Sequence, residues 1–205
     1  MADALTADRP DMPAPKPGAI ILSRHGEPDI SRKVRLSAAG YRSFWASYET
    51  MGIIAGQAPP PELGRLAAGA ATLVCSTRLR SVQSAQALAP EREFTRHQIL
   101  VEAPLPPPNW PSWIKASPRV WGFLARFWWW FFNHHEGQET RRQAEIRADR
   151  AATMLEELAA SGEDVVVTAH GFFNFMIGRA LKRRGWRLSL SQGYKYWSTR
   201  RFEKI

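Results

Sequence analysis

Two histidines occupy similar positions in the sequence, and both are candidates for chemistry. The apolar segment 20–23 ends close to His25, and the apolar segment 165–168 ends close to His170. A glycine follows each histidine, so the backbone can turn sharply there and a ligand can approach closely. A neutral imidazole, whose ordinary pKa is about 6.5, can act as a nucleophile at neutral pH. Taken alone, each histidine would also fit an ordinary hydrogen-bonded residue at a strand end.

Two arginines and a carboxylate lie at comparable positions. Arg24 directly precedes the first histidine, and Arg80 falls in the first turn of a predicted helix that follows the apolar segment 72–75. Glu102 follows the apolar segment 99–101. A guanidinium is planar and permanently charged, so it can bind phosphoryl oxygens with two parallel hydrogen bonds. The combination of imidazole, guanidinium and carboxyl groups suits phosphoryl transfer.

The elements that must position these side chains alternate between strands and helices. Apolar patterns predict strands at 19–22, 72–75, 98–101 and 165–168 and a looser one at 194–203. Periodicity and capping residues predict helices at 38–50, 61–70, 77–89, 119–132, 139–160 and 172–184. This alternation predicts an α/β fold of three layers, αβα, with a mostly parallel central sheet. In such sheets the ligand lies beyond the carboxyl ends of the strands.

The motifs together resemble those of the histidine phosphatase superfamily, whose members have a phosphoglycerate mutase-like fold. Residues 24–27 (Arg-His-Gly-Glu) are similar to its first signature, and 76–85 to the helix start that carries its phosphate-binding arginine. Residues 100–102 resemble the segment that ends in its proton-donating glutamate, and 169–171 resemble its second catalytic histidine. The motifs occur in family order and the resemblance runs from about residue 19 to residue 179.

The resemblance implies a metal-independent phosphomonoester hydrolase without a cofactor, acting on a small anionic phosphorylated substrate through a phosphohistidine. The catalytic residues that it implies are His25 as nucleophile, Glu102 and His170. The phosphate-binding residues that it implies are Arg24, Arg80 and Ser31, the last standing where many relatives carry Asn. The segment after Glu102 is rich in proline and lacks the usual family pattern, so the substrate stays open. Mutases are typically longer, which favours a phosphatase.

Length and composition predict one domain over 18–205 after a flexible arm at 1–17, with a Pro- and aromatic-rich insertion at about 103–135. The net charge is +9, and the last 28 residues hold nine Lys or Arg against one Glu. That excess favours anionic partners, but it equally fits a solvated basic surface. No nucleic-acid-binding motif accompanies it, so we expect no nucleic-acid partner. The single Cys75 excludes an intrachain disulfide, and the cytoplasm is the expected location.

The aromatic segment 119–132 allows three interpretations. It could form a helix over the active-site edge, a homodimer interface, or a contact with a membrane surface. We expect the six aromatic side chains of 127–132 to be at least half buried, because exposure would create a large apolar patch. Two functions besides catalysis stay open: a phosphate-ligand-binding module without turnover, and a peripheral membrane-associated protein that uses this helix and the basic C-terminus.

Overall fold

The computed structural model describes residues 15–205, and most of the predicted arm at 1–17 lies outside the described residues. The strands are β1 (Ile20–Arg24), β2 (Thr72–Ser76), β3 (Thr95–His97), β4 (Val165–Ala169), β5 (Trp186–Ser191) and β6 (Thr199–Lys204). The helices are α1 (Ala38–Thr50), α2 (Pro61–Gly69), α3 (Leu79–Leu88), α4 (Pro118–Phe132), α5 (Arg141–Ala159) and α6 (Gly171–Arg183), with a 3₁₀ turn at Gln98–Leu100.

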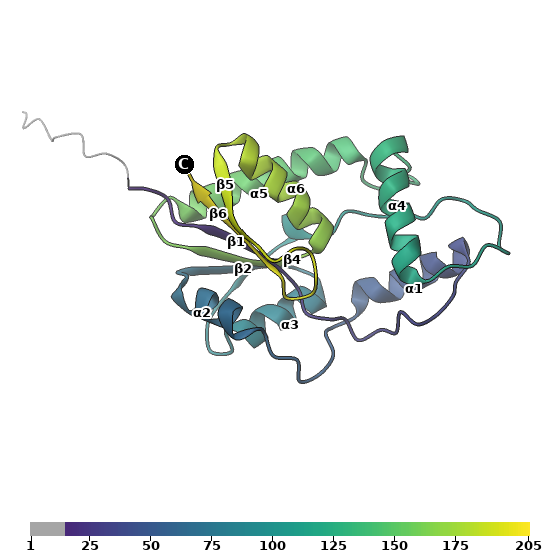
Figure 1. Ribbon diagram of the computed structural model, residues 1–205, viewed down its shortest axis with the longest axis horizontal. Coiled ribbons are helices and arrows are strands. Elements are labelled where there is room, and N and C mark those ends of the chain that lie inside the picture. Colours follow the sequence, from purple (N-terminus) through teal and green to yellow (C-terminus); the bar gives the residue numbers. More distant parts are fainter. Residues whose placement is uncertain (1–14) are drawn as a thin grey trace, which may run out of the picture.

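The strands form one sheet in the order β3-β2-β4-β1-β6-β5. The first four of these are mutually parallel, and β6 and β5 are antiparallel to their neighbours. Helices α5 and α6 cover one face of the sheet, and α2 and α3 cover the other (Figure 1). The predicted three-layer α/β fold with a mostly parallel sheet is therefore confirmed.

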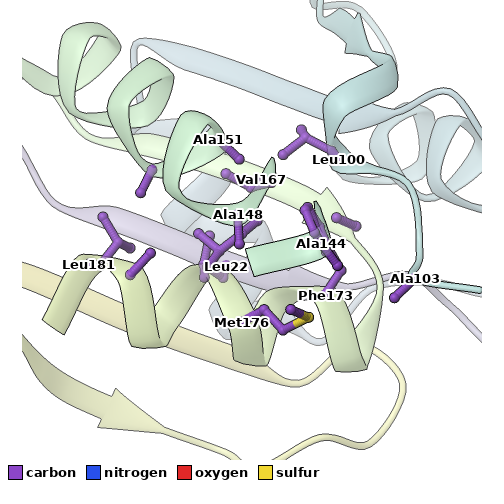
Figure 2. Packing of buried hydrophobic residues seen from close by; sticks show 14 of the residues in the cluster. Leu22, Leu100, Ala103, Ala144, Ala148, Ala151, Val167, Phe173, Met176 and Leu181 are labelled. Carbon is purple, nitrogen blue, oxygen red and sulfur yellow. The ribbon is translucent and has the colours of Figure 1, made fainter. Parts of the chain in front are cut away.

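The central strands are buried on both faces, and their side chains alternate between two cores. On β1, Ile20 and Leu22 pack on the side of α5 and α6, whereas Ile21 packs on the side of α2 and α3. Figure 2 shows how alanines of α5 face α6 and the sheet; Ala144, Ala148 and Ala151 are all buried. These small side chains let the two helices lie close together, which removes more apolar surface from water.

Two predicted strands were wrong in position. The third strand, predicted at 98–101, lies at Thr95–His97, and residues 98–100 form a 3₁₀ turn whose Leu100 is buried in the core. The last strand begins only at Thr199, and the preceding strand β5 was not predicted. Its sequence Trp-Arg-Leu-Ser-Leu-Ser does alternate between apolar and polar residues, which is typical of a half-buried edge strand.

Helices α1 and α4 lie beyond the carboxyl ends of the central strands (Figure 1). Ser37 caps α1 as predicted, and the ring of Tyr41 on α1 stacks on Trp121 of α4 at 6.2 Å. The indole of Trp121 donates to Leu36 O (2.6 Å), which attaches α4 to the chain that leads into α1. No helix in the described part of the chain is long and apolar enough to cross a bilayer.

The expectation that all aromatic side chains of 127–132 are at least half buried was wrong for two of them. Trp129 is fully buried and its indole donates to Glu139 O (3.0 Å), but Phe131 and Phe132 are 65% and 64% exposed. The helix therefore has one buried side and one that faces solvent. The exposed stripe consists of Val120, Phe123, Phe127 and Phe131, and we call it the outer face of α4.

Candidate active site

Three parallel strands end side by side at the centre of the site. His25 follows β1, His170 follows β4, and Ser76 ends β2, which pairs with β4. The backbone N–H of His25 donates to Ala169 O (2.9 Å), which continues the ladder between β1 and β4 into the site. The two imidazole rings consequently lie with centroids 5.2 Å apart in an edge-on arrangement.

The hydrogen bonds of His25 determine which nitrogen carries its proton. Nδ1 lies 2.7 Å from Gly26 O, and because a carbonyl can only accept, Nδ1 must be the protonated nitrogen. Nε2 then keeps its lone pair. Burial, together with the nearby charges of Arg80 and Arg24, holds the pKa of His25 well below 6.5. The imidazole is therefore neutral at pH 7, the form in which it is a nucleophile.

His170 adopts the opposite tautomer. Its Nδ1 faces a guanidinium nitrogen of Arg80 at 3.4 Å, and a guanidinium can only donate, so this Nδ1 accepts. Nε2 must then donate to Ser76 Oγ (2.8 Å). Burial and the charge of Arg80 lower the pKa of His170 well below 6.5. An anion bound beside the ring would act in the other direction and favour the protonated, cationic form.

Arg80 is fully buried at the start of α3 and is held by α1. It donates to the backbone oxygens of Tyr48 and Glu49 and pairs with the Glu49 carboxylate (2.9 Å). Arg78 pairs with the other oxygen of Glu49 at 2.7 Å. Arg80 also lies over the Tyr48 ring, 4.6 Å from its centroid. One carboxylate thus orients two cations at the edge of the site.

Two more arginines border the histidines. Arg24 donates to Tyr194 O (2.7 Å), and its guanidinium lies 4.1 Å from the centroid of the Tyr196 ring. Arg32 lies over the same ring at 5.4 Å. The Nε atoms of Arg24 and Arg80 are buried without a hydrogen-bond partner among the described residues. What favours an anion here is the positive charge of the guanidinium groups that border the cavity.

Glu102 lies beside the first turn of α6. Its Oε1 accepts from the backbone N–H of Phe173 (2.8 Å) and of Ala103 (3.2 Å), and Oε2 accepts a longer bond from Phe172 (3.4 Å). Oε2 is therefore the less engaged oxygen. Glu102 lines the same cavity as both histidines, and it is the only carboxylate among the described lining residues.

The loop after the nucleophilic position is fixed to α3 by one side chain. The Gly26 N–H donates to Ser84 Oγ (2.8 Å), and this hydroxyl donates to Arg80 O (2.6 Å). A Cβ on Gly26 would lie 2.7 Å from the Trp197 ring. Position 26 thus needs a glycine because the Trp197 indole lies so close to it. The sequence alone did not indicate this contact.

The histidines and arginines form the floor of a cavity of about 490 Å³, within the range of small-molecule sites. The floor is lined by Arg24, His25, Arg32, Arg80 and His170. Helices α1 and α6 supply largely aromatic walls, and α4 contributes Pro118, Arg119, Gly122 and Arg126. Five of the six side chains expected to act on a phosphate border this cavity.

Ser31 is the predicted phosphate-binding residue that the structure does not bring into the cavity. It is exposed, and its hydroxyl accepts from the Lys33 N–H (3.3 Å). Its neighbour Arg32 lines the cavity instead. Sequence reasoning also missed Glu49, because nothing in its position near the end of α1 indicated a contact with Arg80.

Within the described residues, no three His, Cys, Asp or Glu side chains group as metal ligands. His134 lies 3.0 Å from Pro107 O and 3.5 Å from the Glu136 carboxylate. Among the glutamates outside the cavity, Glu136 pairs with Arg42 and Glu139 pairs with Arg147.

The family model of the histidine phosphatase superfamily (branch 1) matches residues 20–196. The chain belongs to this superfamily. The match spans all the elements that line the cavity, from β1 to the loop that carries Tyr194 and Tyr196. A search among curated proteins found no match.

Several solved structures are similar in fold to this histidine phosphatase superfamily member, at low sequence identity. The mycobacterial glucosyl-3-phosphoglycerate phosphatase has a TM-score of 0.50 and 16% identity, with 81% of this chain and 80% of that chain covered. YhfR of Bacillus stearothermophilus has a TM-score of 0.50 and 18% identity over 81% and 80%. Mycobacterial hydrolase 2 has a TM-score of 0.50 and 18% identity over 82% and 73%. At these identities the likeness shows the shared fold.

Proposed function

We propose that the chain is a phosphomonoester hydrolase that works through a phosphohistidine on His25. The observation that carries the proposal is the hydrogen bond from Nδ1 to Gly26 O, because it leaves Nε2 unprotonated in a cavity bordered by arginines. A neutral imidazole is not repelled by the negatively charged phosphoryl group, and the arginines offset the charge of that group.

In the first step, Nε2 of His25 attacks phosphorus and the bond from phosphorus to the ester oxygen breaks. The leaving oxygen takes a proton from Glu102, for which Oε2 is the better placed oxygen since its backbone bond is long. In the second step, water attacks the phosphohistidine and gives its proton to the Glu102 carboxylate. Histidine is released neutral, inorganic phosphate forms, and the glutamate is ready for the next cycle.

The cations have distinct tasks in this scheme. The guanidinium groups of Arg24, Arg32 and Arg80 line the cavity and supply positive charge for the phosphoryl oxygens. His170 gains a proton more readily once the phosphate dianion is bound, because a nearby anion favours the cationic ring. Glu49 and Ser76 position Arg80 and His170 and do not contact the substrate.

The test is a rapid quench of the enzyme with ³²P-labelled substrate at alkaline pH, where phosphohistidine survives. We expect label on His25 and none in the His25→Ala variant. Label on Ser23, Ser76 or Cys75 would refute the mechanism. We also expect full turnover in excess chelator; loss of activity that a divalent ion restores would refute metal independence.

The same preparation separates a hydrolase from its two nearest rivals. A mutase would pass the label from His25 to a phosphorylated acceptor at least as fast as to water, whereas a hydrolase releases inorganic phosphate. A binding module without turnover would hold a phosphate ester and form no phosphohistidine. The cavity contains nucleophile, cations and a carboxyl group together, which favours the hydrolase.

A second candidate role is suggested by the outer face of α4. This face exposes Val120, Phe123, Phe127 and Phe131, and the exposed Lys115 and Arg119 lie at its N-terminal end beside the exposed Trp113. The sequence contains no Asp or Glu from residue 103 to residue 135. Apolar rings flanked by cations with no acidic residue complement an anionic lipid surface. We propose that the outer face contacts such a surface.

Flotation with vesicles tests this role. We expect the wild-type protein to float with vesicles that contain phosphatidylglycerol and to float less with phosphatidylcholine alone. The double variant Phe123→Ser/Phe131→Ser should lose flotation, whereas Ile146→Ser, which changes an exposed apolar residue on α5, should keep it. A lipid-free dimer that the double variant dissociates would show that a second copy covers this face and would refute the lipid contact.

A further inference from the structure

The cavity has a strongly uneven distribution of polar groups. The cationic side chains of the floor gather at the ends of β1 and β4 and at the start of α3. The walls above the floor include seven aromatic residues, namely Tyr41, Phe44, Trp45, Tyr48, Phe172, Phe175 and Tyr194. A bound phosphate ester must place its phosphate on the floor, so its organic part lies between these rings.

The aromatic walls are preorganised. On α1, the rings of Tyr41 and Phe44 stack at 6.2 Å, and Phe44 stacks on Tyr48 at 6.3 Å. On α6, Phe172 stacks on Phe175 at 6.0 Å, and Phe175 meets the edge of Tyr194 at 6.3 Å. Rings fixed by their neighbours lose little conformational entropy when a ligand binds. They form two apolar surfaces, one on α1 and one on α6, that border the same cavity.

The space between the two surfaces is kept open by Gly122 of α4. This glycine is buried in the helix interior and lines the cavity, and a Cβ there would approach Tyr41 Oη at 3.4 Å and Arg126 Nη1 at 3.1 Å. A glycine inside a helix is less favourable than alanine, so its presence fits a need for room. Any larger side chain would project toward the wall formed by α1.

The polar side chains that α4 adds to the walls are Arg119 and Arg126. Arg126 donates to Gly122 O (2.8 Å), and Arg119 is exposed. Glu102 is the only carboxylate among the described lining residues, and it already accepts backbone bonds from α6. Burial raises the pKa of Tyr41 to about 12, so its hydroxyl stays protonated. A sugar would lose hydrogen bonds to water at the aromatic surfaces without full replacement, whereas an apolar group would gain from burial there.

We propose that the substrate is a phosphomonoester of an apolar alcohol or phenol, whose carbon body lies between α1, α4 and α6. This inference rests on the proposed function, since it takes the phosphate to be bound by His25 and the arginines. It specifies the class of leaving group: an uncharged, largely hydrocarbon body large enough to reach both aromatic surfaces.

The test compares ethyl, butyl and hexyl phosphate below their aggregation concentrations. The three alcohols are almost equally good leaving groups, so differences in kcat/KM report how well the protein binds the alkyl group of the substrate. Burial of each methylene should raise kcat/KM by up to about fourfold, and we expect hexyl phosphate to exceed ethyl phosphate by about tenfold or more. Glycerol 1-phosphate should resemble ethyl phosphate or be poorer. A flat series, or a preference for glycerol 1-phosphate, would overturn the inference.

Two variants change the walls in opposite ways, since one fills the cavity and the other enlarges it. Gly122→Leu fills the space between α1 and α4, so the hexyl-to-ethyl ratio should collapse toward one. Phe44→Ala removes one ring of the wall and should lower the ratio several-fold. Ile146→Ala, on the exposed side of α5, should leave the ratio unchanged. Unchanged ratios in both wall variants would place the organic group elsewhere. Thermal unfolding of each variant shows that it is folded.

A binding measurement separates failure of this inference from failure of the proposed function. Alkylphosphonates cannot be hydrolysed, and calorimetric titration of His25→Ala with ethyl- and hexylphosphonate needs no turnover. If no ester is hydrolysed but hexylphosphonate binds about tenfold more tightly, the hydrolase proposal fails and the apolar pocket stands. If ethyl phosphate labels His25 but the two phosphonates bind equally, only the apolar pocket fails.

Discussion

The floor of the cavity and helix α4 are built on opposite principles. The floor residues His25, Arg80 and His170 are buried and held by strand ladders, backbone carbonyls and one carboxylate. Helix α4 is attached through Trp121 and Trp129 on one side and exposes aromatic rings on the other. We therefore expect the rigid strand ends to carry the chemistry and α4 to select what reaches them. Changes to the floor should therefore affect every substrate, and changes to α4 should affect only some.

The largest effect is expected for His25→Ala. Without the nucleophile, turnover of any phosphate ester should fall by about four orders of magnitude or more. The fold should survive, because the imidazole makes a hydrogen bond only with the adjacent Gly26. Steady-state kinetics and circular dichroism of the purified variant check both statements. Residual turnover above a hundredth of wild type would contradict the role of His25.

Glu102→Gln should come next, and its effect should depend on the leaving group. The amide cannot supply a carboxyl proton, so phosphohistidine formation from an alkyl phosphate should fall by about 10²–10⁴-fold. Formation from an aryl phosphate with an acidic phenol should fall far less. Breakdown of the intermediate should slow for both, because water still needs a base. Equal slowing of the first step for both esters in single-turnover kinetics would make Glu102 a structural residue at the start of α6.

Gly26→Ala should give an intermediate loss that does not depend on the substrate. The new methyl group would lie 2.7 Å from the Trp197 ring, so the loop must shift and Nε2 of His25 must move with it. We expect kcat to fall by about 10–100-fold for alkyl and aryl esters alike. Gly64→Ala, at a glycine with nothing within 4 Å of its Cβ position and no positive φ, is the matched control and should keep the wild-type kcat. Wild-type kcat in Gly26→Ala would show that the loop tolerates the shift.

A smaller effect concerns stability below pH 6.5. The pKa values of His25 and His170 are lowered in the folded protein, so the unfolded chain binds more protons between those values and about 6.5. The free energy of unfolding should therefore fall as the pH falls from 6.5 toward 5, by up to about 1.4 kcal/mol per pH unit for each histidine. Urea unfolding at several pH values measures the slope. His25→Ala should remove the contribution of one histidine from the slope of the unfolding free energy against pH. An unchanged slope would contradict the lowered pKa of His25.

The smallest effect on catalysis is expected on the outer face of α4. Phe131→Ser changes a side chain that is exposed and does not line the cavity, so kcat/KM for ethyl phosphate should change by less than about twofold. Assays with and without anionic vesicles check whether any effect needs lipid. A large loss with ethyl phosphate in the absence of lipid would mean that the two sides of α4 are coupled.

Much of the site could be predicted because its motifs are local. Each strand that ends in the site is a short, continuous apolar segment, and residues at the end of such a strand reach the same edge of the sheet whatever the loops do. His25, His170, Arg24 and Arg80 therefore meet in the cavity as the order of the motifs suggested. The helices could be predicted for the same reason, since periodicity and caps are properties of contiguous residues.

The errors arose where a position depends on partners that are distant in sequence. The third strand was misplaced because residues 99 and 100 are apolar for packing against α5, not for pairing in the sheet. The last strand was set too early because the apolar and aromatic residues at 194–197 face the site instead of forming a ladder. Ser31 was chosen by its spacing from His25, yet the turn of the loop brings Arg32 to the cavity.

The sequence by itself determined the order of the elements, the strand-end histidines and the nearby arginines, because these follow from local hydrophobic pattern and residue chemistry. Only the tertiary structure decided three other properties. It set the tautomers of the two histidines through Gly26, Ser76 and Arg80, and it brought Glu49 to Arg80 from another helix. It also divided α4 into a side that borders the cavity and a side that faces solvent. Each of these depends on which surfaces meet across the fold, and no local pattern encodes that.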